Sequence, residues 1–400
     1  MLSEQSWWEG KQRIKDIKNR HDIALIAIVH IVMDVYPAAL PVLISFLVTD
    51  LGLSLAQAGF LNTVFISAAS FSQPLFGYWS DRYTRSGLLA TGVAWTALFV
   101  GLTGTGTSYP TILVLLVVGS LGIAVFHPLG AALVASWGGQ RKGTATSIFY
   151  LGGNLGFAVG PIVMAAALGQ SGRIGTLWLI VPGVMAGFLL WKKMEVSSSQ
   201  LVRPRASLEK AVLSTAGLGL AVLVILFGLR SWIHSAVSTF LPIYLLSRGF
   251  SLDLASAWLA AFMVAGALGG LAGGYFSDLF GRKPIICGSL LAFVPCFWLF
   301  MNMESLVSLL FLGLAGFMAV ASHAVVVVMA QELLPDNTGM ASGAIVGLAA
   351  GLGSWGVALS GMMADRFGLP TSLNLLMPLT LLAVLFGLLV PKPRGIPPHF

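Results

Sequence analysis

Two short stretches of this 400-residue chain are near copies of each other: Gly77-Tyr-Trp-Ser-Asp81-Arg82-Tyr-Thr-Arg85 and Gly274-Tyr-Phe-Ser-Asp278-Leu-Phe-Gly281-Arg282-Lys283. The second stretch begins 197 residues after the first, which is close to half of the chain length. Each stretch follows a long apolar run and contains several charged residues. This pattern indicates two similar halves, each of which turns back at a charged loop.

The composition predicts an integral membrane protein. Hydrophobic residues make up 57% of the chain and charged residues 9%, and the mean hydropathy is +0.89. Soluble domains carry about 25% charged residues, because their surface faces water. A chain with so little charge is expected to contact lipid.

Long apolar runs predict the fold class, because a helix needs about 20 such residues to cross the hydrocarbon core. The class is all-α, with twelve transmembrane helices in two pseudo-repeated six-helix bundles. The expected parts are a cytoplasmic N-terminal segment (1–21), two bundles (22–191 and 211–390), a polar linker (192–210) and a cytoplasmic tail (391–400). The twelve predicted runs are 22–48, 56–79, 86–106, 110–135, 143–170, 173–191, 211–246, 254–276, 284–301, 305–330, 338–364 and 371–390.

The basic residues predict the orientation. The chain has 22 Lys and Arg residues and a formal charge of +7. All but four of these residues fall on one predicted side; Arg173, Arg248 and Arg366 fall on the other side, and Arg230 lies inside an apolar run. An excess of Lys and Arg marks the cytoplasmic side of membrane proteins. The basic charge therefore reports topology and not nucleic-acid binding, and both termini are predicted to be cytoplasmic.

Polar residues inside the apolar runs repeat as well. His30 and Asp34 of the first run are followed 200 residues later by Arg230 and His234 of the seventh run. A parallel repeat of six spans with polar residues at corresponding depths is typical of major facilitator transporters.

The charged loops resemble the signature loop of the major facilitator superfamily, Gly-x-x-x-Asp-Arg/Lys-x-Gly-Arg-Arg/Lys, between helices 2 and 3. The first copy departs from the signature at Thr84, where glycine is usual, and at Ser86, the last basic position. The resemblance implies the major facilitator fold, in which two bundles rock about a central site.

Within that superfamily the chain resembles the fosmidomycin-resistance family of bacterial drug exporters. This resemblance implies export of a small drug-like compound, and it is not specific for a substrate. The segments that carry it are His30-x-x-x-Asp34, Val125-Phe-His-Pro128, Ser147-Ile-Phe-x-x-Gly-Gly-Asn154 with Gly160-Pro161, and Ala330-Gln-Glu-Leu-Leu-Pro335 leading to Gly339-Met-x-Ser-Gly343.

Asp34, with His30 one helical turn before it, is predicted to be the proton-coupling site. The two residues share a helix face, so they can hydrogen-bond or exchange a proton. A carboxylate inside a membrane span is costly to keep without a use. The competing interpretation is that Asp34 only braces the helix break at Pro37 and Pro41.

Arg230 and His234 are predicted to bind an anionic substrate. Arginine stays charged when it is buried, and its fork of donors matches a phosphonate or a carboxylate. The alternatives are a salt bridge between Arg230 and Asp34 of the other bundle, and a snorkelling arginine on a tilted helix.

His127, His323 and Asn154 are further candidates for substrate binding. His127 and His323 are 196 residues apart, in helices 4 and 10, which line the cavity of this fold by resemblance. The alternative for each histidine is a hydrogen bond to a nearby backbone carbonyl, such as the one that Pro128 frees. The alternative for Asn154 is bracing between helices.

Glycines recur at close spacing in the fifth run, at Gly152, Gly153, Gly156 and Gly160. Such a stripe lets another helix pack closely. Its later part resembles a helix 5 motif of antiporters, although the earlier glycine of that motif is missing.

The two charged loops are predicted to be cytoplasmic gates. An aspartate just past helix 2 can meet the positive N-terminal end of a helix from the other bundle. By resemblance, Asp81 would meet helix 11 and Asp278 helix 5. Glu332 and Asp336, in a predicted cytoplasmic loop without Lys or Arg, are candidate partners for Arg82 or Arg85. The alternative is that the loops are only tight turns. The gating candidates are Gly77, Asp81, Arg82, Arg85, Gly274, Asp278, Gly281, Arg282 and Glu332.

No cofactor or metal site is predicted. Cys287 and Cys296 share one apolar run, and no Cys or carboxylate lies at ligand spacing to His127 or His323. The sequence has no Gly-x-x-x-x-Gly-Lys loop and no nucleophile with a base. An enzyme or a nucleotide-driven pump is therefore not expected.

Together these features predict a monomeric secondary active transporter in the cytoplasmic (inner) membrane of a prokaryote. The favoured function is proton-coupled antiport of a small, anionic, fosmidomycin-like drug, so the partners are that small molecule, protons and membrane lipid. A proton symporter or uniporter for an organic anion would share these features. A non-transporting receptor or an enzyme is the remaining alternative.

Overall fold

The computed structural model describes residues 20–80, 86–138, 141–193, 215–303, 305–334 and 341–390. Within these ranges the chain is helical, without a strand, so the predicted all-α class is confirmed. Most of the predicted N-terminal segment, the linker beyond Lys193 and the C-terminal tail lie outside the described residues. So do Asp81, Arg82, Arg85 and Asp336.

The described part of the N-terminal half consists mainly of long helices. Two turns of 3-10 helix, at 102–105 and 172–179, lead out of α4 and into α7. The described helices are α2 (Arg20–Leu51), α3 (Leu55–Ser80), α4 (Ser86–Gly101), α5 (Tyr109–Trp137), α6 (Lys142–Ser171) and α7 (Ile180–Lys193).

The C-terminal half repeats this plan with two differences. The predicted single run 305–330 breaks at Ser322, directly before His323, and a π-helix at Gly343–Ala349 leads into α15. Hydropathy carries no signal for either feature, because it does not report backbone conformation. The described helices are α9 (Thr215–Ser247), α10 (Leu252–Phe280), α11 (Arg282–Asn302), α12 (Ser308–Ala321), α13 (His323–Leu333), α15 (Ala350–Phe367), α16 (Leu369–Asn374) and α17 (Leu376–Leu389).

Ten stretches of the described chain are long and apolar enough to cross a membrane. One of them, Gly143–Lys193, contains both α6 and α7, and α3 with its 26 residues is not among the ten. The count of twelve spans therefore stays a prediction.

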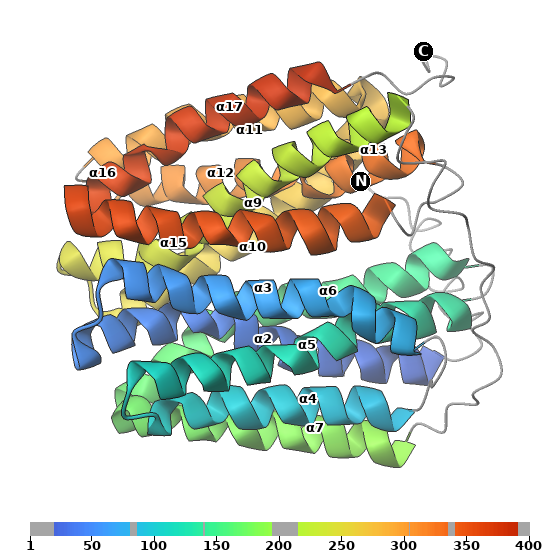
Figure 1. The fold of residues 1–400 in the computed structure, drawn as a ribbon, viewed down its shortest axis with the longest axis vertical. Helices are drawn as coiled ribbons and strands as arrows, with labels where there is room; N and C mark the ends of the chain where they lie inside the picture. The colour runs from blue at the N-terminus through green and yellow to red at the C-terminus, as the bar shows by residue number, and fades with distance from the viewer. Residues whose placement is uncertain are drawn as a thin grey trace, which may run out of the picture.

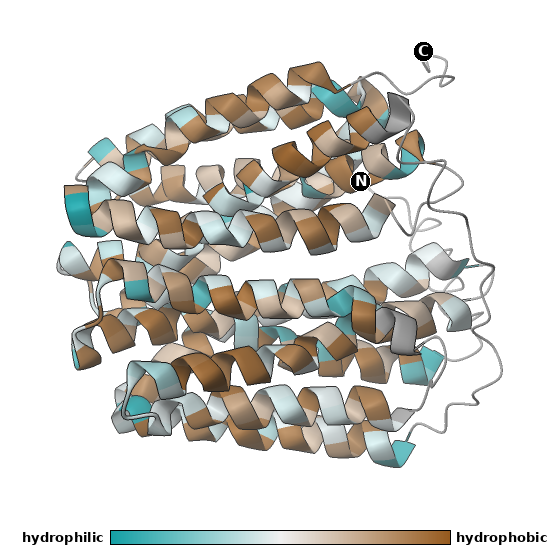
Figure 2. Cartoon of the chain, viewed as in Figure 1, coloured by the Kyte–Doolittle hydropathy of each residue, from teal (hydrophilic) through white to brown (hydrophobic). Residues whose placement is uncertain are grey.

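The two halves lie one above the other in Figure 1, with α2 to α7 in the lower part and the C-terminal helices in the upper part. Apolar residues cover the outward faces of the helices, and many polar residues gather near the helix ends (Figure 2). Large apolar side chains such as Trp178, Phe188 and Leu271 are more than half exposed. Such a surface is stable only against lipid.

The halves contact each other closely along α3 and α15. Thr63 Oγ1 donates to the backbone oxygen of Ser354 at 2.7 Å, and the hydroxyls of Ser67 and Ser354 are 2.8 Å apart. At the start of α3, the carboxylate of Asp365 accepts hydrogen bonds from the backbone N–H groups of Leu55 and Ala56, at 2.8 and 2.9 Å. These contacts join the two halves from the start of α3 to its middle.

Candidate functional site

A cavity of about 380 Å³ lies between the two halves. All five residues predicted to bind substrate line it: His127 and Asn154 from the N-terminal half, and Arg230, His234 and His323 from the C-terminal half. The structure thus brings together residues from α5, α6, α9 and α13 that are far apart in the sequence.

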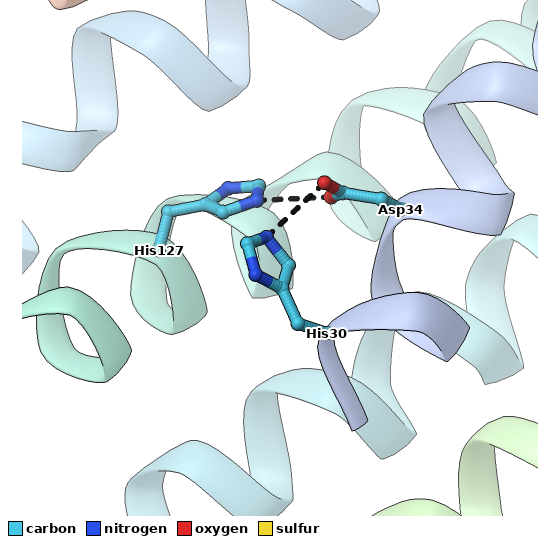
Figure 3. A group of neighbouring side chains, drawn as sticks. All are labelled: His30, Asp34 and His127. Atoms are coloured by element: carbon cyan, nitrogen blue, oxygen red, sulfur yellow. Dashed lines mark hydrogen bonds and ion pairs between the residues drawn. The ribbon is translucent and has the colours of Figure 1, made fainter. Parts of the chain in front are cut away.

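A cluster of three titratable side chains adjoins this cavity in the N-terminal half (Figure 3). His30 and Asp34 project from α2 and His127 from α5, and the three side chains point toward one another. His30 Nε2 lies 3.1 Å from Asp34 Oδ2, and His127 Nε2 lies 2.9 Å from Asp34 Oδ1. Each carboxylate oxygen of Asp34 therefore has its own imidazole partner.

His30 is held on its other side by the backbone of α6. Its Nδ1 lies 2.8 Å from the carbonyl oxygen of Phe149, and its ring stacks on the Phe149 ring with centroids 3.9 Å apart. A carbonyl oxygen can only accept, so Nδ1 of His30 carries the proton in this bond. Nε2 is left to face Asp34.

The glycines of α6 form the wall behind this cluster. A Cβ atom at Gly153 would lie 2.5 Å from Asp34 Oδ2 and 2.9 Å from the His30 ring, and one at Gly156 would lie 2.9 Å from Asp34 Cβ. Gly152 and Gly160 likewise pack against the backbone and side chains of α2. The glycine stripe therefore packs α6 onto α2 and leaves room for the buried acid.

The prediction that no carboxylate lies at ligand spacing to His127 is wrong. Asp34 is 93 residues away in the sequence and hydrogen-bonds to it, because α5 packs beside α2. The ligand atoms of His30, Asp34 and His127 all lie within 4.8 Å of one another, so this residue set could hold a metal ion. Its nitrogen–oxygen separations of 2.9 and 3.1 Å are those of hydrogen bonds. The absence of a metal centre stays a prediction.

In the C-terminal half, Arg230 is buried without a counter-ion among the described residues. Its side chain is 3% exposed, its Nε has no hydrogen-bond partner, and its Cζ lies 5.3 Å from the centroid of the Phe227 ring. The alternative of a salt bridge to Asp34 is not what the structure shows, because Asp34 is already paired with two imidazoles.

Aromatic rings position the two histidines near Arg230. His323 meets the Phe227 ring edge-on with centroids 5.0 Å apart, and His234 stacks on Phe262 at 5.7 Å. Neither histidine has a carboxylate partner in the described part of the chain. Arg230 therefore carries the charge on this side of the cavity.

Several polar residues that line the cavity were not predicted to bind substrate. Asn62 Nδ2 and Thr239 Oγ1 are buried without a hydrogen-bond partner, and the hydroxyl residues Ser231 and Ser235 lie beside Arg230 and His234 on α9. Ser231 and Ser235 are one helical turn apart in an apolar run, and this spacing is the signal that could have identified them.

The gating candidates of the second loop contact each other within one half. Arg282 pairs with Asp278 and donates to Glu332 Oε1 from Nη2 at 3.0 Å and from Nε at 3.2 Å. Asp278 was predicted to meet helix 5 of the other half, and Glu332 to pair with the first loop. In the structure Arg282, at the start of α11, donates to both carboxylates at once. Arg82 and Arg85 of the first loop lie outside the described residues, so the predicted contacts between the halves stay predictions.

The glycines of the loops have different roles. Gly281 ends α10 with a φ of +90°, which favours glycine, whereas a Cβ at Gly274 would meet nothing within 4 Å. Gly77 lies in the last turn of α3. An unpredicted contact between the halves is Asp365 at the start of α3.

Comparison with known proteins supports a transporter. The sequence profile of the Major Facilitator Superfamily matches the chain over residues 24–259 and 223–399. The fosmidomycin resistance protein of Escherichia coli (strain K12) is 29% identical, with 92% of this chain and 91% of that protein covered. The hexuronate transporter of Bacillus subtilis (strain 168) is 24% identical, with 83% and 84% covered.

The fold is also that of solved transporters. A bacterial homolog of the human lysosomal transporter Spinster, in an inward-facing and occupied conformation, superposes with a TM-score of 0.81 at 16% sequence identity, covering 92% of this chain and 96% of that one. Since the superfamily profile spans both halves, the chain belongs to the Major Facilitator Superfamily and is a multi-pass membrane transporter, not an enzyme.

Proposed function

We propose that this transporter is a proton-coupled antiporter that exports a small anionic, fosmidomycin-like compound. One observation carries the proposal: Arg230 lies in the cavity between the halves, and none of the described residues that line the cavity is acidic. A buried guanidinium without a counter-ion favours binding of a carboxylate or a phosphonate, to which it can donate two parallel hydrogen bonds. The similarity to a fosmidomycin resistance protein supports this substrate class.

Asp34 and His30 are the proposed proton-coupling residues. The Asp34 carboxylate is buried in a membrane-spanning helix, where an acid is costly, and it has two imidazole partners that can give or take a proton. Protonation of Asp34 favours one orientation of the two halves, and deprotonation favours the other. Arg230 and His234 hold the anion, with His323 and Asn154 beside it.

The transport cycle follows from these two sites. The halves rock about the cavity, so that it opens to one side of the membrane at a time, and the charged loops act as cytoplasmic gates. We place the protein in the bacterial inner membrane as a monomer with both termini in the cytoplasm, because the basic residues gather on that side.

Proton-coupled symport of an organic anion is a second candidate. The hexuronate transporter supports it, since a hexuronate is a carboxylate. Counterflow of radiolabelled substrate, with and without a pH gradient, separates the two directions. A gradient that drives accumulation only when the compartment opposite to the substrate is acidic indicates antiport.

Proteoliposomes test the proton-coupling role. Wild-type protein, Asp34→Asn and Asp50→Asn are reconstituted, and fosmidomycin transport is driven by an imposed pH gradient. Asp50 is the matched control, because it lies at the C-terminal end of α2, outside the cluster, and pairs with Arg173 at 3.0 Å. We expect Asp34→Asn to abolish gradient-driven transport and Asp50→Asn to retain it. If Asp34→Asn transports as well as the wild type, the coupling assignment fails.

A further inference from the structure

We infer, building on the proposed role of Asp34 as the proton carrier, that protons reach Asp34 from the cavity only through the imidazole of His127. His127 was predicted to bind substrate. Its position between the cavity and the buried carboxylate assigns it to the proton path instead.

Exposure separates the three members of the cluster. The side chains of His30 and Asp34 are 2% and 6% exposed, whereas that of His127 is 26% exposed. His127 is also the member of the cluster that lines the cavity. A proton that enters from cavity water therefore meets His127 first.

His30 cannot take this role, because its ring is held in place. Nδ1 of His30 donates to the carbonyl oxygen of Phe149, one face stacks on the Phe149 ring, and Gly153 leaves no free space beside Nε2. Both ring nitrogens are therefore occupied inside the protein. His30 can share a proton with Asp34, but it has no path to the cavity.

His127 has the atoms that a relay requires. Nε2 hydrogen-bonds to Asp34 Oδ1, and Nδ1 has no hydrogen-bond partner among the described residues. A proton from cavity water binds to Nδ1, the Nε2–H bond breaks, and that proton passes to Asp34 Oδ1. The imidazole is left neutral as its Nδ1–H tautomer, and it is reset when the ring rotates into the cavity, where Nε2 takes a proton from water and Nδ1 releases its proton to water.

Few other titratable groups face this path. Tyr150 of α6 has its ring centroid 6.4 Å from that of His30. From the C-terminal half, Arg230, His234 and His323 line the same cavity. In the described part of the chain no carboxylate lines the cavity, so no lining side chain offers an acidic route to Asp34.

A pH jump on purified protein tests the relay without a substrate. The infrared band of the protonated Asp34 carboxyl, identified as the band missing from Asp34→Asn, is followed in time after acidification. We expect His127→Ala to slow its appearance by about 100-fold, the lower end of what a positioned acid–base group contributes. Free imidazole should restore the rate, because it can enter the space that the missing ring leaves in the cavity wall.

Two further variants distinguish a proton-relay role of His127 from a purely structural role. His127→Gln keeps an N–H donor for Asp34 but cannot pass a proton, so it should be as slow as His127→Ala and should not respond to imidazole. His21→Ala, which removes an exposed histidine at the start of α2 outside the cavity lining, should keep the wild-type rate. Wild-type rates in His127→Ala or His127→Gln would overturn the relay. A wild-type protein without any Asp34 band would instead overturn the proposed coupling role of Asp34.

Discussion

The two halves of the molecule carry polar residues at matching positions, but the charged residues of the two halves have different partners. In the N-terminal half, the carboxylate of Asp34 lies between two imidazoles, at 3.1 and 2.9 Å. In the C-terminal half, Arg230 has no carboxylate partner among the described residues, and its guanidinium lies over the ring of Phe227. A paired acid can exchange a proton with its neighbours, whereas an unpaired cation needs a partner from outside the protein. The repeated positions therefore serve different ligands.

The starts of two corresponding helices show the same divergence. Helix α10 is capped by its own half, since Ser251 Oγ accepts from the backbone N–H of Leu254 at 3.3 Å. Helix α3 has the same serine cap, since Ser54 Oγ accepts from the backbone N–H of Gln57 at 3.1 Å, and it has a further cap from the other half, the carboxylate of Asp365. One cap stabilises a helix, and the other also joins the two halves.

Removing the unpaired cation should have the largest effect on binding. Arg230→Gln is expected to weaken binding of fosmidomycin by about 10- to 100-fold, because hydrogen bonds to a charged group contribute about 1.5–3 kcal/mol. Titration calorimetry on the purified protein measures this change. Arg248→Gln is the control, because Arg248 follows the same helix and lies over the ring of Tyr244, away from the cavity lining. Equal thermal shifts of the wild type with anionic and cationic compounds would contradict the role of Arg230.

Reducing the space around Asp34 should have an intermediate effect, which is expected on gradient-driven transport. A methyl group at Gly153 would overlap Asp34 and His30, and overpacking of this kind costs about 1–3 kcal/mol. Gly153→Ala is therefore expected to reduce gradient-driven transport by about tenfold and to lower the melting temperature. Gly169→Ala in the same helix meets nothing within 4 Å and should keep both properties. Equal behaviour of the two variants would show that the wall of α6 does not hold the cluster.

Removing the cap between the halves should have the smallest effect. Loss of a helix cap costs about 0.5–2 kcal/mol, so Asp365→Ala is expected to raise the population that is open at this end by about fivefold. The labelling rate of a cysteine placed at Ala58, which is fully buried, reports this opening in a background where Cys287 and Cys296 are replaced by serine. Asp253→Ala, an exposed acid in the first turn of α10, is the control. An unchanged rate for Asp365→Ala would mean that the cap does not hold the halves together.

Hydropathy and the repeated loops were sufficient to predict the all-α class and the two halves, because apolar runs and repeated motifs can be recognised from the sequence alone. The choice of Asp34 and Arg230 as buried charged residues was also possible from sequence, since each interrupts an apolar run. The helix break at Ser322 was not predictable in this way, because the apolar run resumes directly after His323 and hydropathy does not report backbone conformation.

Contacts between helices that are distant in the chain could not be predicted from the sequence. The bond between His127 and Asp34 depends on how α5 packs beside α2, and the sequence offered only a resemblance for the position of His127. The partners of Arg282 were difficult to predict for a different reason. Its partners Asp278 and Glu332 were both recognised as charged loop residues, but nothing in the sequence distinguished partners within one half from partners in the other.

Calorimetry in two buffers of different ionisation enthalpy tests most directly whether one half binds the proton and the other the anion. It counts the protons that are released or taken up when fosmidomycin binds. If the anion at Arg230 and the proton at Asp34 exclude each other, as antiport requires, binding releases protons from the wild type. Asp34→Asn should then bind without proton release, and Arg230→Gln should bind weakly or not at all. Proton uptake by the wild type, or equal release from the wild type and Asp34→Asn, would contradict this assignment.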